Sequence, residues 1–165
     1  MKKIALVLAL FAFGFANAQA PLEEGGFQLN GGFGATTYGA SAYAGLEYGL
    51  MKDISIGGEI SYQSYGATTA ISGYGNDYNI NAIGVQANGS YHFNELLQIP
   101  SKFDVYAGAN VNYYSWSKND YGVNSVGLGV HAGGRYFFTD NLGVNVQLGG
   151  GNVFSGVKVG ITYKL

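Results

Sequence analysis

An alternation of apolar and small polar residues with a period of two recurs eight times between Phe27 and the C-terminal Leu165. This period is typical of a β-strand with one face in apolar and the other in polar surroundings. After the N-terminal leader, no stretch is apolar for long enough to span a membrane as a helix. The pattern predicts an all-β fold, an eight-stranded antiparallel up-and-down transmembrane β-barrel. The last apolar phase comprises Val157, Val159, Ile161, Tyr163 and Leu165.

The other seven apolar phases predict strands of roughly nine to thirteen residues, and about 9–11 tilted residues cross a bilayer core. They lie within 27–35, 42–50, 54–62, 83–93, 103–113, 126–138 and 142–148. Aromatic residues gather at the strand ends, as in the interfacial girdles of membrane barrels. One end has Phe27, Tyr48, Phe93, Phe103, Phe138 and Tyr163, and the other has Tyr38, Tyr62, Tyr113 and Trp116.

A soluble eight-stranded barrel of the lipocalin type, with its apolar phase turned inward, is the alternative fold. Its polar phase would face water and would be rich in lysine and glutamate. Here the polar phase carries few charges, and its small or amide side chains suit the narrow interior of an eight-stranded membrane barrel. This phase includes Gly45, Gly57, Asn88, Gly108, Asn110, Gly129, Gly133, Asn145 and Gln147.

The first residues have the pattern of a secretory leader. Lys2 and Lys3 precede an apolar run over residues 4–15, which is too short to span a bilayer. Ala18 ends a small-residue cleavage site, and cleavage after Ala20 is the other candidate. We therefore expect a signal peptide at 1–18 and one outer-membrane barrel domain at 19–165.

Composition excludes several classes of protein. The chain has no cysteine, so it can form neither a disulfide framework nor a lipid-modified N-terminal cysteine. Without the two leader lysines, six basic residues stand against ten acidic ones, and no basic run remains. No nucleic acid partner is therefore expected, and no cofactor or metal site is indicated.

Loop lengths orient the predicted barrel. With both termini in the periplasm, the inner turns are Lys52-Asp53, 94–102 and 139–141, and the outer connections are 38–41, 67–79, 115–124 and 150–155. Longer outer than inner connections are usual in outer-membrane barrels. The turn at 94–102 is longer than that rule prefers.

The hairpin that contains GLEYGL (45–50) and IGGEISY (56–62) resembles small outer-membrane β-barrel proteins of the opacity and OmpA/OmpX type. The segments GRYFFTDNLG (134–143) and VKVGITYKL (157–165) resemble them as well. The resemblance implies insertion by the barrel-insertion machinery into a membrane of lipid and lipopolysaccharide. It does not imply one activity, because the family includes adhesins, surface scaffolds and proteins of unknown role. Family members often end in Phe or Trp, whereas this chain ends in Leu165.

Four charged residues of the inward phase are expected to meet as one buried cluster at mid-barrel: Glu47, Glu59, Arg135 and Lys158. Matching the outward phases of the second and third strands requires a three-residue or bulged connection at 52–54, which could set Glu47 opposite Glu59. Opposed carboxylates repel, so the two cations must neutralise them. Such a cluster would either fix the strand register and block the lumen or gate a narrow pore.

Ser90 and His92 share the inward phase and could act as a nucleophile and its base. Asp104, at the start of the next strand, is the nearby acid that could orient the histidine. Barrel enzymes that modify lipid A act in the outer leaflet, however, whereas His92 lies beside the inner rim. We expect polar filling of the lumen instead, also for His131, which has no second ligand at metal-binding spacing.

Two outer loops share an Asn-Asp-Tyr core, at 76–78 and 119–121. Asn and Asp are ordinary turn residues and Tyr is an ordinary girdle residue, yet Tyr, Ser, Gly and Asn are also typical of recognition loops. A host or surface protein, or a glycan, is the partner that such loops would bind. The binding candidates are Tyr74, Asp77, Tyr78, Trp116, Asp120 and Tyr121.

These features predict a non-enzymatic structural or interaction protein of the bacterial outer membrane. Its loops would be presented at the cell surface and would serve adhesion, scaffolding or envelope integrity. A narrow gated channel through the charge cluster is the first alternative function. A lipid-modifying barrel enzyme is the second.

Overall fold

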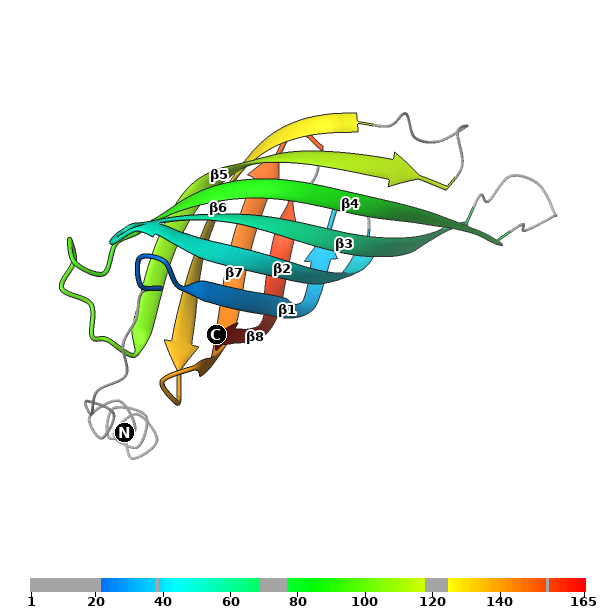
Figure 1. Cartoon of the computed structure of the whole chain (residues 1–165). Helices are drawn as coiled ribbons and strands as arrows, with labels where there is room; N and C mark the ends of the chain where they lie inside the picture. The colour runs from blue at the N-terminus through cyan, green and yellow to red at the C-terminus, as the bar shows by residue number, and fades with distance from the viewer. Residues whose placement is uncertain (1–21, 38, 69–76, 118–124, 154) are drawn as a thin grey trace, which may run out of the picture.

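The computed structural model describes residues 22–37, 39–68, 77–117, 125–153 and 155–165. The predicted signal peptide at 1–18 lies outside these residues. Eight antiparallel strands close into a barrel, because β1 pairs with β8 as well as with β2 (Figure 1). The strands are β1 (Phe27–Thr36), β2 (Gly39–Met51), β3 (Ile54–Thr68), β4 (Asp77–His92), β5 (Phe103–Trp116), β6 (Ser125–Phe137), β7 (Leu142–Gly151) and β8 (Gly156–Lys164). This order confirms the predicted up-and-down barrel.

The apolar and polar phases of each strand point to opposite sides of the barrel wall. Apolar side chains point outward, and Phe33 is 72% exposed and Val126 69% exposed. Polar side chains fill the inside, where Gln28 and Thr162 are fully buried. A large apolar side chain that stays in water lacks the stabilisation of about 1.5–3 kcal/mol that burial provides. This outer surface therefore requires contact with lipid. The lipocalin-type alternative, with its apolar phase inward, is therefore wrong. Among the described residues, no helix is long and apolar enough to cross a membrane.

Aromatic side chains pair at the end of the barrel where β1 begins and β8 ends, as the inner girdle predicts. Loop lengths predict that this end faces the periplasm, so it is called the periplasmic end below, and the opposite end is called extracellular. The ring centroids of Phe27 and Tyr48, on adjacent strands, lie 5.0 Å apart. The outer girdle differs from the prediction at Trp116, which pairs with Ala82, an inward residue that is 1% exposed. Trp116 therefore belongs to the inward phase and not to the lipid-facing girdle. Tyr38 lies outside the described residues.

The N-terminal segment packs against the periplasmic end of the barrel. Leu22 is buried, and the amide of Gly25 donates a hydrogen bond to the carbonyl of Gly49 at 2.8 Å. A Cβ atom at Gly49 would lie 2.0 Å from the carbonyl oxygen of Glu23. Only glycine at this position allows so close an approach.

The inner turns agree with the prediction to within one residue, and the outer ends do not. β3, β4 and β5 contain 15, 16 and 14 residues, more than the predicted range. Residues 67–68 and 77–79 of the predicted loop at 67–79 consequently belong to β3 and β4. Backbone pairing thus continues beyond Tyr62 and Ile83, where the apolar phases read from the sequence end.

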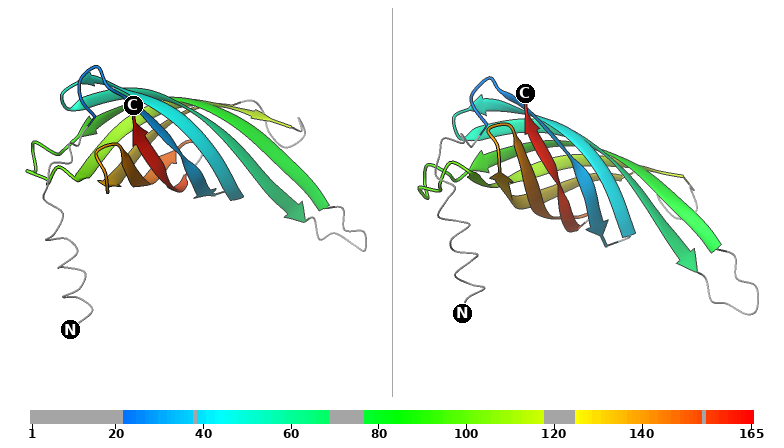
Figure 2. Two further views of the ribbon diagram at one scale, coloured as in Figure 1. Left: turned by 60° about the horizontal axis from the view of Figure 1, so that its bottom comes forward. Right: turned by 90° about the horizontal axis from the view of Figure 1, so that it is seen from below.

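β3 and β4 extend together beyond the rest of the barrel. They pair as far as Thr68 and Asp77, whereas β2 pairs with β3 only up to Ser64 and β5 pairs with β4 only up to Ala82. Figure 2 shows these two strands running past the ends of β1, β2 and β8. We call segments 65–68 and 77–80 the ribbon.

Candidate functional site: a buried charge network in the lumen

Arg135, on β6, is the centre of a buried charge network in the periplasmic half of the lumen. Its Nη2 donates to Oε2 of Glu47 at 2.5 Å, and its Nη1 donates to Oδ2 of Asp104 at 2.7 Å. The guanidinium carbon lies 4.1 Å from the centroid of the Tyr106 ring. These three charged residues are at most 5% exposed. Charges buried to this extent are tolerated only with partners, and here each charged group has one.

His92 and Ser55 close this network into a ring. Nδ1 of His92 lies 2.7 Å from Oδ1 of Asp104, and its Nε2 lies 2.9 Å from the hydroxyl of Ser55. Ser55 in turn donates to Oε1 of Glu47 at 2.5 Å. The five residues come from five consecutive strands, β2 to β6. We call them the lumen ring: Glu47, Ser55, His92, Asp104 and Arg135.

Hydrogen bonds extend from the lumen ring to the other three strands. Gln28 and Asn30 on β1 donate to Oε2 of Glu47 at 3.2 and 3.1 Å. Thr162 on β8 donates to Asn30 at 2.7 Å, and Asn145 on β7 donates to Thr162 at 2.9 Å. Every strand therefore contributes to the polar filling of this half of the lumen.

The four charged residues predicted as one cluster form two ion pairs. Glu47 pairs with Arg135 in the lumen ring, and Glu59 pairs with Lys158 nearer to the extracellular side. Lys158 also lies over the ring of Tyr43, with its ammonium nitrogen 5.1 Å from the centroid. The second pair is less buried than the first, since the side chains of Glu59 and Lys158 are 12% and 21% exposed.

Glu47 does not lie opposite Glu59, and that prediction is wrong. The β2–β3 ladder pairs Glu47 with Gly57, and Glu59 with Gly45. The connection is bulged, as expected, with a register shift between Gly49 and Met51. The resulting register staggers the two carboxylates by two residues, or roughly 6–7 Å along the strands. Each glutamate is consequently neutralised by a different cation.

Ser90 and His92, which were considered as a nucleophile and its base, have different hydrogen-bond partners. The hydroxyl of Ser90 lies 2.9 Å from Nε2 of His131, while His92 contacts Ser55 and Asp104. Residues two apart on a strand are separated by about 6–7 Å, so their partners come from other strands. Gly108 lies between Ser90 and His131 in the sheet.

Ser55, His92 and Asp104 together have the order of a nucleophile, a base and an orienting acid. Sequence reasoning missed Ser55 because it lies 37 residues before His92. The predicted strands could have indicated Asp104 as a member of the lumen ring, because Asp104 pairs directly with Arg135 in the β5–β6 ladder. Ser55 is 1% exposed and donates its hydroxyl to Glu47. The Ser55 hydroxyl is thus enclosed within the lumen ring. The described part of the chain holds no cluster of His, Cys, Asp and Glu that could bind a metal ion.

The predicted surface residues are only partly described. Asp77 and Tyr78 begin β4 and belong to the ribbon instead of a loop, and Trp116 ends β5. Tyr74, Asp120 and Tyr121 lie outside the described residues. The structure thus places three of the six candidates on extended strands at the extracellular end.

No protein-family model matches the sequence, and no curated protein matches it. Solved structures do share its fold. The outer-membrane protein OprG from Pseudomonas aeruginosa has a TM-score of 0.64 at 15% identity, covering 87% of this chain and 97% of that chain. A de novo designed transmembrane β-barrel has a TM-score of 0.60 at 19% identity, covering 88% and 100%. Ail of Yersinia pestis, in complex with the heparin analogue sucrose octasulfate, has a TM-score of 0.51 at 13% identity, covering 85% and 97%.

The similarity to these solved structures is a similarity of fold. The apolar outer surface of the barrel agrees with it. The chain has the architecture of the small outer-membrane β-barrels, as its sequence resemblance implied. Its apolar outer face is satisfied only by lipid. The protein is therefore a transmembrane β-barrel.

Proposed function

We propose that this protein is a non-conducting outer-membrane barrel that binds a partner at the cell surface, and that the ribbon makes the contact. One observation carries the proposal. β3 and β4 stay paired from Tyr65 and Ile80 to Thr68 and Asp77, beyond the last residues that β2 and β5 reach. The barrel thus presents a two-stranded extension on its extracellular side.

The edges of the ribbon suit contact with another molecule. Within the described residues, no strand lies beside segment 65–68 on the β2 side or beside 77–80 on the β5 side. Unpaired backbone groups cannot lie in the hydrocarbon core, so the ribbon is placed in water above the membrane. An exposed edge of this kind is where a further extended chain can pair. We therefore expect a protein partner that adds a strand to the ribbon.

The lumen ring favours this function over the alternative of a gated channel. An ion would have to pass Arg135 where it holds both Glu47 and Asp104, and all three are buried. Separating them would leave charges without partners in a medium of low dielectric constant, which costs several kcal/mol. A lipid-modifying enzyme is disfavoured for a different reason, because Ser90 and His92 have separate partners.

The complex of Ail with a heparin analogue shows a barrel of this fold bound to a sulfated sugar. A surface glycan is therefore the alternative partner for this chain. A glycan would be held by side chains. Tyr74, Asp120 and Tyr121 remain predicted contact residues for it. It would not require a free strand edge.

The experiment that tests the proposal uses a photo-crosslinking residue at Ala67 of the ribbon in the native outer membrane. A matched control carries the same residue at Ile60, which lies on the same strand and faces lipid. A second variant replaces residues 66–79 by Asn-Gly, a two-residue hairpin turn joining the paired Tyr65 and Ile80. Crosslinkers at Tyr74 and Trp116 test the predicted loop residues in parallel.

We expect a discrete protein adduct at Ala67, no such adduct at Ile60, and loss of partner binding in the shortened variant. The shortened barrel should still fold, as judged by its mobility in unheated gels. Absence of an adduct at Ala67, or full partner binding by the shortened variant, would refute a role for the ribbon.

A further inference from the structure

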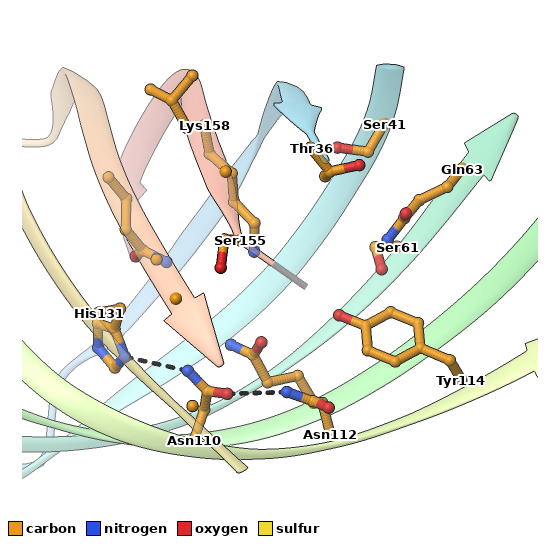
Figure 3. Close-up of a pocket in the computed structure, with 17 residues that line it drawn as sticks. Thr36, Ser41, Ser61, Gln63, Asn110, Asn112, Tyr114, His131, Ser155 and Lys158 are labelled. Carbon is orange, nitrogen blue, oxygen red and sulfur yellow. Dashed lines mark hydrogen bonds between the residues drawn. The ribbon is translucent and has the colours of Figure 1, made fainter. Parts of the chain in front are cut away.

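The polar cavity in the extracellular half of the lumen is too small to hold an organic ligand (Figure 3). Its volume is about 60 Å³, which leaves room for a few water molecules. Side chains of its wall also contact one another, since Asn112 donates to Asn110 at 3.0 Å and Nδ2 of Asn110 lies 3.5 Å from Nδ1 of His131. Apolar side chains at the surface of the barrel give a stronger indication of an interaction.

The connection between β4 and β5, residues 93–102, exposes two adjacent leucines. We call this connection the long turn. Leu96 is 66% exposed and Leu97 is 60% exposed, much like the lipid-facing Val130 at 65%. The other two connections at this end have only polar residues at 52–53 and 139–141. Leucines in water lack the stabilisation that burial provides, so this pair indicates contact with another molecule.

Hydrogen bonds give the long turn a fixed shape. The amide of Leu97 donates to the carbonyl of Phe93 at 2.9 Å, which closes one helical turn. The amide of Ile99 donates to the carbonyl of Asn94 at 2.9 Å, and Gln98 has a left-handed φ of 52°. Such a bond around a left-handed residue is a common end of a helix. The two leucines are therefore presented by an ordered segment.

Asn94 fastens the long turn to the start of β5. Its Nδ2 donates to the carbonyl of Phe103, and the amide of Val105 donates to its Oδ1 at 3.2 Å. The side chain of Asn94 is buried. Glu95 forms an ion pair with Lys52 of the β2–β3 connection, with Oε2 and Nζ 2.6 Å apart. The long turn is therefore held at the rim of the barrel, beside the neighbouring turn.

The level of the leucines follows from the inner girdle. Phe93 belongs to this girdle, and its ring centroid lies 5.1 Å from that of the lipid-facing Tyr91. Aromatic girdles mark the membrane–water interface. The four residues from Phe93 to Leu97 rise about 6 Å in a helical turn, whereas an extended chain would cover about 13 Å. Because the interfacial region is roughly 5–8 Å deep on each side, Leu97 lies within reach of the lipid headgroups.

The charges of the long turn are compatible with a lipid surface. Glu95 is its one acidic residue, and Lys52 neutralises it. Lys102 is the last residue of the turn. A lysine of this kind can bury its aliphatic stem in apolar surroundings while its ammonium group reaches a phosphate. An anionic headgroup thus meets no unpaired carboxylate of the long turn.

We propose that the long turn is a lipid anchor, in which Leu96 and Leu97 insert into the headgroup region of the lipid leaflet at the periplasmic end. Interfacial segments bury their apolar side chains about 5–10 Å into the boundary between headgroups and acyl chains. The anchor continues the lipid-facing surface of β4 and β5 beyond the hydrocarbon core. It accounts for a long, apolar connection where outer-membrane barrels usually have short turns. The anchor does not depend on the ribbon, which lies at the opposite end of the barrel.

The test uses single-cysteine variants, since the chain has no cysteine of its own. Leu97→Cys carries a bimane label in the full mature chain, with one barrel in each nanodisc of phosphatidylcholine and phosphatidylglycerol. Asp140→Cys is the control in water, because Asp140 is exposed in a polar connection at the same end. Val105→Cys is the control in lipid, because Val105 faces outward on β5. Iodide quenching measures access from water, and phosphatidylcholine spin-labelled near its headgroup measures contact with lipid.

We expect iodide to quench the label at Leu97 about threefold or more weakly than the label at Asp140, because the leucine position is buried among headgroups. Spin-labelled lipid should quench the label at Leu97 and at Val105 but not at Asp140. Leu96→Cys is the second probe if Leu97→Cys does not fold, as judged by mobility in unheated gels. The proposal is overturned if iodide reaches Leu97 as readily as Asp140. Protection from iodide without quenching by lipid would also overturn it, because protein and not lipid would then cover the leucines.

Discussion

Nη2 of Arg135 lies 2.5 Å from Oε2 of Glu47, although the two residues are 88 positions apart in the chain. The same guanidinium holds Asp104 at 2.7 Å on its other side. One cation thus binds two buried carboxylates from β2 and β5. Because of this relationship, the lumen ring is expected to be sensitive to substitution.

Arg135→Met is expected to destabilise the barrel by about 3–5 kcal/mol, because it leaves two buried carboxylates without their cation. Urea unfolding in lipid vesicles, followed by the fluorescence of the single tryptophan, measures the change. Lys52→Ala is the control, since the Lys52–Glu95 pair is exposed and its loss should not shift the unfolding curve measurably. An unchanged midpoint for Arg135→Met would contradict the importance of the ring.

The native barrel is expected not to conduct ions, because the lumen ring fills its periplasmic half. Ion flux from liposomes that contain the refolded protein checks this expectation. Lys158→Met should leave the flux at background, since that ion pair lies apart from the ring. Discrete conductance in the native protein that is altered by Lys158→Met would instead support a gated channel.

Gly133→Ala is expected to destabilise the barrel by about 1–3 kcal/mol, the usual effect of overpacking. A Cβ at Gly133 would lie 2.5 Å from the hydroxyl oxygen of Tyr106 and 2.8 Å from the carbonyl oxygen of Val146. Gly134→Ala is the matched control, since its Cβ would meet only the carbonyl oxygen of Asp104 at 3.7 Å. Equal unfolding curves for the two variants would show that Tyr106 is not tightly packed.

Overexpression of the protein is expected to leave the acylation of lipid A unchanged. Ser90 and His92 do not contact each other, and Ser55 is buried beside Glu47. Mass spectrometry of extracted lipid A measures any change. A change in acylation that is abolished by Ser90→Ala or His92→Ala would revive the enzyme alternative.

The mature protein is expected to begin at Gln19, because Ala18 completes the predicted cleavage site. Intact-mass measurement of protein purified from outer membranes tests this expectation. A mature chain that begins at Pro21 would indicate the second candidate site, after Ala20. Retention of residues 1–18 would disprove the signal peptide.

Local features of the sequence were enough to predict the barrel and the direction of its side chains. The period-two alternation is a property of neighbouring residues, so it assigned Phe33 and Val126 to the lipid face and Glu47 and Arg135 to the lumen. The apolar phases read from the sequence end at Tyr62 and begin again at Ile83. For that reason the ribbon at 65–68 and 77–80 was predicted largely as a loop.

Which inward residues meet was decided only by the tertiary structure. The bulge between Gly49 and Met51 sets the β2–β3 register and staggers Glu47 from Glu59. Closure of the barrel then brings Arg135 on β6 to Glu47 on β2. Contacts across a lumen depend on the summed register and tilt of many strand pairs. No single stretch of sequence carries that sum. The sequence by itself therefore determined the fold and the direction of the side chains, whereas the closed barrel determined the lumen ring and the Ser90–His131 contact.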